Sequence, residues 1–73
     1  MNLDRITFGP RVMAGKACVR GMRISVSLIV NLVANVMTRQ EILSAYPDLQ
    51  DEDITQALGY AAWAAGDPVS DAA

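Results

Sequence analysis

The feature that most constrains this chain of 73 residues is that it holds one cysteine, Cys18, and no histidine. Small domains bury a limited core and usually rely on disulfides, a structural metal or a partner subunit. One cysteine cannot form an intramolecular disulfide, and a Cys/His zinc cluster is excluded. We therefore expect a single small domain that forms a homodimer, and we expect it to hold no metal and no cofactor.

Charge divides the chain into two unlike ends. Residues 1–23 hold five basic side chains and one acidic, a net charge of +4, whereas residues 40–73 hold seven acidic side chains and no basic one. The division indicates either ordinary solvated surface or two binding surfaces of opposite sign, which would also suit a self-complementary dimer.

The first 24 residues have the pattern of short strands separated by turns. Pairs that favour strands, such as Ile6-Thr7 and Cys18-Val19, alternate with glycines, of which Gly21 is the last. An isolated hairpin is marginal in water, so this one must pack on helices or pair across a dimer. We expect Cys18 to be a small buried hydrophobe.

The segment from Val26 to Met37 predicts a helix that is apolar over much of its circumference, because nine of its twelve residues are apolar. Val30 and Ala34 fall beside the main apolar stripe, so we expect them at an interface with another subunit. Asn35 is placed to end the helix in a left-handed conformation.

Two further helices are predicted from their end signals. Thr38 and Glu41 have the spacing of a capping box, and Pro47 stops the helix that they begin. A third helix is expected over residues 51–65, because small apolar residues recur there at three- and four-residue intervals and Gly66 suits its carboxyl end.

The expected fold is mainly α: a three-helix helix-turn-helix bundle with a short amino-terminal β-hairpin. Residues 1–66 would form one domain, with the hairpin region at 1–24 and the bundle at 25–66, and residues 67–73 a flexible tail. The uncharged stretch 25–38 is shorter than the roughly 18 to 20 residues that cross a bilayer. We see no signal peptide, and the lone thiol suits a reducing compartment. We therefore expect a cytoplasmic protein that has no membrane as a partner.

Two blocks of sequence resemble a known family. The amino-terminal block holds Ile6-Thr7 before Pro10, Gly15-Lys16 and Gly21-Met22-Arg23-Ile24-Ser25-Val26. The second block holds Glu41-Ile42-Leu43, Tyr46-Pro47-Asp48-Leu49, Asp53-Ile54, Ala57-Leu58 and Tyr60-Ala61. In this arrangement, from Ile6 to Ala62, the chain resembles the family called domain of unknown function 433. It departs from the family's pattern at Asn35, where glycine commonly ends the first helix, and at Gln50, where threonine commonly caps the third.

The resemblance implies a homeodomain-like three-helix bundle with an amino-terminal β element. It also implies an antitoxin-like partner of a PIN-like nuclease toxin, encoded beside it, that also binds its own operator DNA. The alternative function is a homodimeric structural or interaction domain with no role on nucleic acid.

Base reading by the third helix is disfavoured by its residue types. With Ile54 in the core, the outward face is expected to carry six residues, Glu52, Thr55, Gln56, Gly59, Tyr60 and Trp63. This face has no basic residue, and its acidic start would repel phosphates. Gln56 is its best single candidate for contact with a base, and Tyr60 is a further candidate contact.

Basic residues of the hairpin are the more credible binding groups. Lys16, Arg20 and Arg23 are predicted to contact an acidic partner, either the phosphates of DNA or the carboxylate-rich site of a nuclease. The alternative is that Arg23 forms an internal ion pair with the acidic helical region and fixes the hairpin to the bundle.

Trp63 lies nearly opposite the apolar stripe of the third helix, which makes it a candidate anchor of an interface. The alternative is that its ring folds back across the bundle. We expect no enzyme, because the chain lacks histidine, a nucleophile paired with a base and a phosphate-binding glycine motif.

Overall fold

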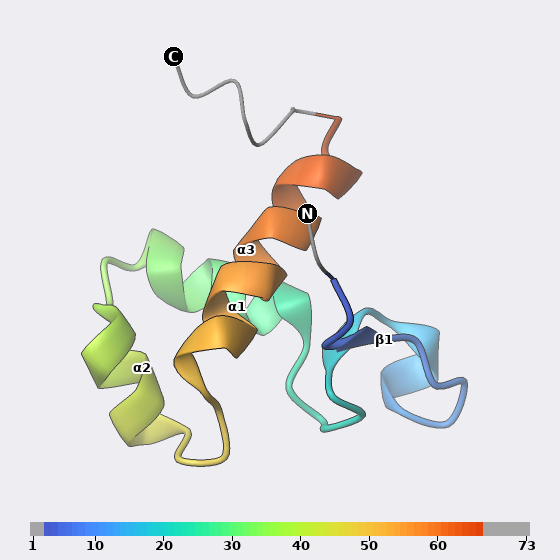
Figure 1. Cartoon of the computed structure of the whole chain (residues 1–73), viewed down its shortest axis with the longest axis horizontal. Helices are drawn as coiled ribbons and strands as arrows, with labels where there is room; N and C mark the ends of the chain where they lie inside the picture. Colours follow the sequence, from blue (N-terminus) through green and yellow to red (C-terminus); the bar gives the residue numbers. More distant parts are fainter. Residues whose placement is uncertain (1–2, 67–73) are drawn as a thin grey trace.

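The computed structural model describes residues 3–66, in which three helices follow a small β element (Figure 1). The elements in chain order are β1 (Ile6–Thr7), the turn η1 (Met13–Gly15), β2 (Cys18–Val19), α1 (Val26–Ala34), α2 (Arg39–Ala45) and α3 (Asp51–Ala64). The mainly α fold with an amino-terminal hairpin is confirmed. The expected tail at residues 67–73 lies outside the described residues.

The β element is an antiparallel pair of two-residue strands, with Ile6 opposite Val19 and Thr7 opposite Cys18. The chain leaves β2 through a tight turn, in which Arg20 has a φ of 47° and Gly21 a φ of 71°. The Thr7 hydroxyl accepts from the Gly21 backbone N–H at 2.8 Å and holds this turn against β1. A hairpin this short is held by what it packs against.

Local capping fixes where the helices begin. The Ser25 hydroxyl accepts from the Leu28 N–H, and Thr38 and Glu41 form the predicted reciprocal capping box at the start of α2. The prediction for the end of α1 is wrong by one residue. Asn35 has a φ of −88°, and Val36 takes the left-handed conformation with a φ of 64°.

One hydrophobic core lies between the helices and the hairpin. Its buried members are Val19, Val26, Ile29, Ile42, Leu49, Ile54 and Ala57. In Figure 1, α3 crosses α1, with α2 on one side and the hairpin on the other. The helix α3 therefore packs against α1, and it also contacts α2 and the strand β1 of the hairpin. No helix within residues 3–66 is long and apolar enough to cross a lipid bilayer.

Candidate partner-binding site

The hairpin is tied to α3 by a buried carboxylate. Asp53 lies in the first turn of α3 with a side chain that is 0% exposed. Its Oδ1 accepts from Arg5 Nη1 at 2.9 Å, and its Oδ2 accepts from Arg20 Nη2 at 2.9 Å and from the Gln50 backbone N–H at 2.8 Å. Arg5 precedes β1 and Arg20 follows β2, so one carboxylate fixes both strands to the helix.

The same contacts set the charge of Asp53. Burial by itself raises the pKa of this carboxyl, because a buried site disfavours the charged form. Hydrogen bonds from Arg20, the Gln50 backbone and Arg5 outweigh burial, so the pKa of Asp53 lies below its ordinary value. The hydrogen bond to Asp53 in turn raises the pKa of Arg20. The cluster therefore stays ionised and acts as a structural tie.

Gln56 belongs to the same contact, which corrects its predicted place on the outward face of α3. Its side chain is 3% exposed. Oε1 accepts from the Arg5 backbone N–H at 2.9 Å, and Nε2 donates to Asp4 Oδ1 at 3.0 Å. Gly59, one turn further on, is also buried. Gln56 is therefore unavailable to read a base, because the amino-terminal segment covers it.

Arg20 and Arg23, which were both predicted to contact a partner, differ in the structure. Arg20 binds Asp53 and donates from Nη2 to the Asp48 carbonyl at 2.7 Å, so its guanidinium is already hydrogen-bonded to residues of the same chain. The predicted internal ion pair therefore belongs to Arg20 and Arg5. Arg23 is exposed and has no hydrogen bond or ion pair with any described residue.

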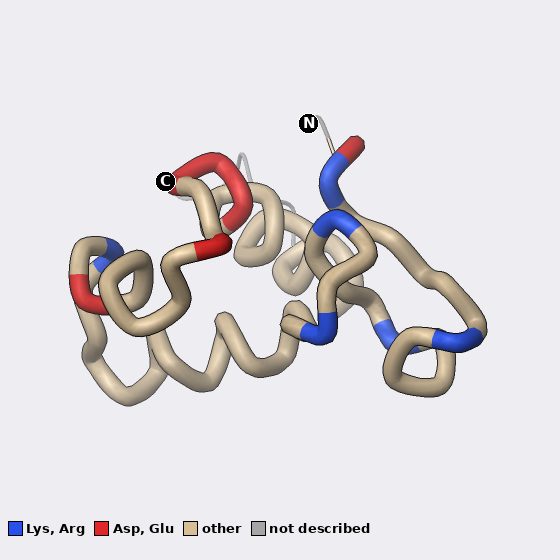
Figure 2. The backbone as a smooth tube through the Cα atoms, turned by 90° about the horizontal axis from the view of Figure 1, so that it is seen from below, with Lys and Arg blue, Asp and Glu red and all other residues tan. Residues whose placement is uncertain are grey.

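Three basic side chains remain exposed on the hairpin side. Arg11, Lys16 and Arg23 make no ion pair within residues 3–66. Figure 2 shows the basic residues, apart from Arg39 of α2, gathered around the hairpin, while the acidic residues, apart from Asp4, surround α2 and the start of α3. The charge division of the sequence is thus also a division in space.

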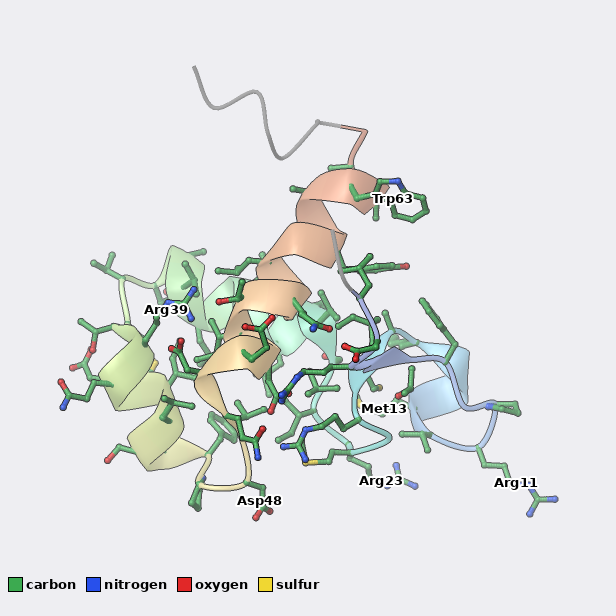
Figure 3. All side chains as sticks on the ribbon, in the orientation of Figure 1. Arg11, Met13, Arg23, Arg39, Asp48 and Trp63 are labelled. Carbon is green, nitrogen blue, oxygen red and sulfur yellow. The ribbon has the colours of Figure 1, made fainter. Side chains whose placement is uncertain are left out.

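The surface where α2 meets the start of α3 is acidic, and hydrogen bonds from one arginine join the two helices there. Arg39 on α2 donates to Asp51 Oδ1 at 2.9 Å and to Thr55 Oγ1 at 2.9 Å, which joins the two helices at the surface. Its side chain extends from α2 toward α3 in Figure 3. The face that a helix-turn-helix protein would place against DNA therefore offers carboxylates and one engaged arginine.

Three aromatic rings lie side by side at the surface, here called the aromatic row: Phe8, which follows β1, and Tyr60 and Trp63 in the second half of α3. The ring centroids of Phe8 and Tyr60 lie 5.7 Å apart in an edge-to-face arrangement, and those of Tyr60 and Trp63 lie 5.9 Å apart. Trp63 is 65% exposed and Phe8 is 52% exposed. Figure 3 shows Trp63 projecting from the carboxyl-terminal end of α3, as predicted for an anchor that points outward.

A pocket lies directly beside this row. It is lined by Lys16, by Val30 of α1 and by Tyr60 of α3, so three of the predicted contact residues meet at one place. Ala34 is exposed further along α1 and does not line it. Sequence reasoning missed Phe8 and Ala61. The signals in the sequence were the period-two spacing of Phe8 from Ile6, which packs against the core, and the helical spacing of Ala61 from the core residue Ala57.

Among residues 3–66 there is no group of three or more His, Cys, Asp or Glu side chains able to hold a metal ion. Cys18 is buried, as predicted. The exposed surface beside the hairpin offers the apolar and aromatic side chains of the aromatic row and the cations Arg11, Lys16 and Arg23.

Comparison with known proteins gives one match. No curated protein matches the chain, and no solved structure does. Residues 6–61 match the family described as Protein of unknown function (DUF433). Because the match covers more than half of the chain, this protein belongs to the DUF433 family.

Proposed function

We propose that this protein is a non-enzymatic binding module, the antitoxin-like partner of a PIN-like nuclease, and that it holds the nuclease through the aromatic row. The observation that carries the proposal is the exposure of Trp63 and Phe8 on either side of Tyr60. Tryptophan and tyrosine are enriched among the residues that contribute most to protein interfaces. A row of three rings is a large apolar surface for a chain of this size to leave in water.

The role of Asp53 favours binding over catalysis. A general acid needs a pKa near the working pH, whereas the contacts of Asp53 with Arg5 and Arg20 lower its pKa. The buried carboxylate of the described residues, Asp53, is thus committed to holding the fold. The exposed carboxylate of Asp51 is likewise paired, with Arg39.

The test is a titration of the protein with the purified product of the PIN-like reading frame expected beside its gene. Trp63 is the only tryptophan, so its emission should shift to shorter wavelength as the partner covers it. Calorimetry should show that Trp63→Ala weakens binding at least tenfold, the size typical of an interface hot spot. Val36→Ala, which shortens an exposed apolar side chain outside the row, is the matched control and should stay within about twofold.

Two results would overturn the proposal: no PIN-like reading frame beside the gene, or a nuclease that does not bind the wild-type protein. Light scattering belongs to the same experiment, because we expect a homodimer. If Trp63→Ala turns a dimer into a monomer and no nuclease binds, the chain is a homodimeric interaction domain instead.

Operator DNA is a second candidate partner, favoured by the cations Arg11, Lys16 and Arg23 on the hairpin side, which make no ion pair with any residue from 3 to 66. DNA bound there would lie away from the acidic start of α3. The test is a gel shift with the DNA upstream of the gene at low and moderate salt. Arg23→Ala should weaken binding and reduce its salt dependence, because one phosphate contact is lost. No shift at low salt would exclude this function.

A further inference from the structure

The pocket beside the aromatic row has a volume of about 460 Å³, within the roughly 300 to 1,000 Å³ typical of ligand sites. It lies between the first half of α1, the second half of α3 and the segment that leads into β2. Its walls are mainly aliphatic, formed by Ala17, Val26, Val30 and Ala61. Such a pocket favours a bulky apolar group, which leaves water when it enters.

Tyr60 and two further polar residues, Lys16 and Ser27, complete the lining. Lys16 supplies its only charge, and its ammonium has no ion pair within the described part of the chain. Ser27 adds a hydroxyl from the first turn of α1, where the helix dipole is positive. Both features favour a negative charge at the edge of an apolar site. The complementary ligand therefore carries an apolar group with a carboxylate close to it.

Tyr60 belongs both to the pocket wall and to the centre of the aromatic row. A chain that crosses the row between Phe8 and Trp63 therefore passes the pocket. This continuity favours a segment of a protein over a small free acid, because the segment can use the rings and the pocket together.

We propose that the pocket takes an acidic and apolar segment of the protein partner: a bulky apolar side chain enters between α1 and α3, and a neighbouring carboxylate pairs with Lys16. The inference rests on the proposed function and adds to it the kind of sequence that the partner presents. It also gives Lys16 a role separate from that of Arg11 and Arg23, which do not line the pocket.

The chemistry of the pocket can be tested without the nuclease. Octanoate and octanol serve as probes with the same chain and different charge, and amide shifts of the full protein report their binding. Octanoate should bind about fivefold tighter than octanol and shift the amides of Ala17, Val30 and Ala61, since an exposed ion pair contributes up to about 1 kcal/mol. Lys16→Ala should remove the preference for octanoate, whereas Arg11→Ala should keep it.

A second variant blocks the apolar part. Ala61→Phe fills the pocket and should abolish binding of both probes, while Lys16→Ala keeps binding of octanol and is too exposed to threaten the fold. Equal affinity for the two probes in the wild-type protein, or shifts away from the pocket, would overturn the assignment.

The last measurement separates this inference from the proposed function. In the calorimetric assay with the nuclease, Lys16→Ala should weaken binding about fivefold, again the effect of one exposed ion pair, and Arg11→Ala should not. If the nuclease binds the wild-type protein but Lys16→Ala and Ala61→Phe leave its affinity unchanged, the pocket inference is wrong and the proposed function is still supported. If the probes bind as expected but the nuclease does not bind, the nuclease is not the partner and the proposed chemistry of the pocket is still supported.

Discussion

The two halves of α3 differ in what they bury. In the amino-terminal half, the polar residues Asp53 and Gln56 are inside and are hydrogen-bonded to the segment around Arg5. In the carboxyl-terminal half, Tyr60 and Trp63 carry aromatic surface on the outside. Polar residues in the interior and aromatic residues on the surface reverse the usual distribution. We infer that the first half holds the fold together and the second half meets the partner.

The largest expected effect is the loss of Asp53. Asp53→Ala should lower the free energy of unfolding by about 2 to 3 kcal/mol, less than for a fully buried pair because both arginines keep partial contact with water. Asp51→Ala is the matched control in the same turn of α3, since its ion pair with Arg39 lies at the surface. It should cost under about 1 kcal/mol. Urea unfolding followed by circular dichroism measures both, and equal losses would contradict a special role for Asp53.

Acid should weaken the same contact. The pKa of Asp53 is lowered in the folded protein, so its ion pairs contribute their full stability above the unfolded pKa of about 3.9. This contribution is lost as pH falls from there through the folded pKa. Asp53→Asn should remove this part of the pH dependence, which thermal unfolding between neutral and acid pH would detect. An unchanged acid profile in Asp53→Asn would show that other carboxylates control acid unfolding.

Local sequence signals predicted the fold well, and the contacts between distant residues escaped prediction. Thr38, Glu41 and Pro47 act within a few residues of themselves, so the helix boundaries follow from short-range chemistry. Helical spacing from Ile54 placed Gln56 on the outward face, and nothing in one sequence indicates that the backbone of Arg5, 51 residues away, binds it. An acidic residue in the first turn of a helix is favoured by the helix dipole whether it is buried or exposed, so nothing in the sequence distinguished Asp53 from its neighbours Asp51 and Glu52.

The candidate site was predictable in part for the same reason. Lys16, Val30 and Tyr60 stood out by charge, helical position and aromatic character, and they meet at one pocket. Arg20 and Arg23 could not be told apart, because they flank Gly21 and share one chemistry. The turn after β2 decides between them, since it directs Arg20 to Asp53.

A smaller effect is expected at Gln56. Gln56→Ala leaves the Arg5 backbone N–H without its acceptor and should cost about 1 to 1.5 kcal/mol. The matched control is Gln40→Ala on α2, because the Gln40 side chain is exposed and makes no hydrogen bond to another side chain or backbone group within residues 3–66. Its stability should stay within about 0.5 kcal/mol of the wild type. If the two variants lose the same stability, the amide of Gln56 does not hold the amino-terminal segment.

The smallest effect on stability should come from the other half of α3. Trp63→Ala removes a ring that is 65% exposed and should lower the free energy of unfolding by less than about 1 kcal/mol, because most of the ring stays in water and its aromatic contact is with Tyr60. For a domain of this size, that corresponds to a shift of less than about 8 °C in the unfolding midpoint. A loss above about 1 kcal/mol, comparable with that of Gln56→Ala, would make the ring part of the fold. Only a ring that folding does not require can serve mainly to bind a partner, so this thermal scan should precede the binding assays.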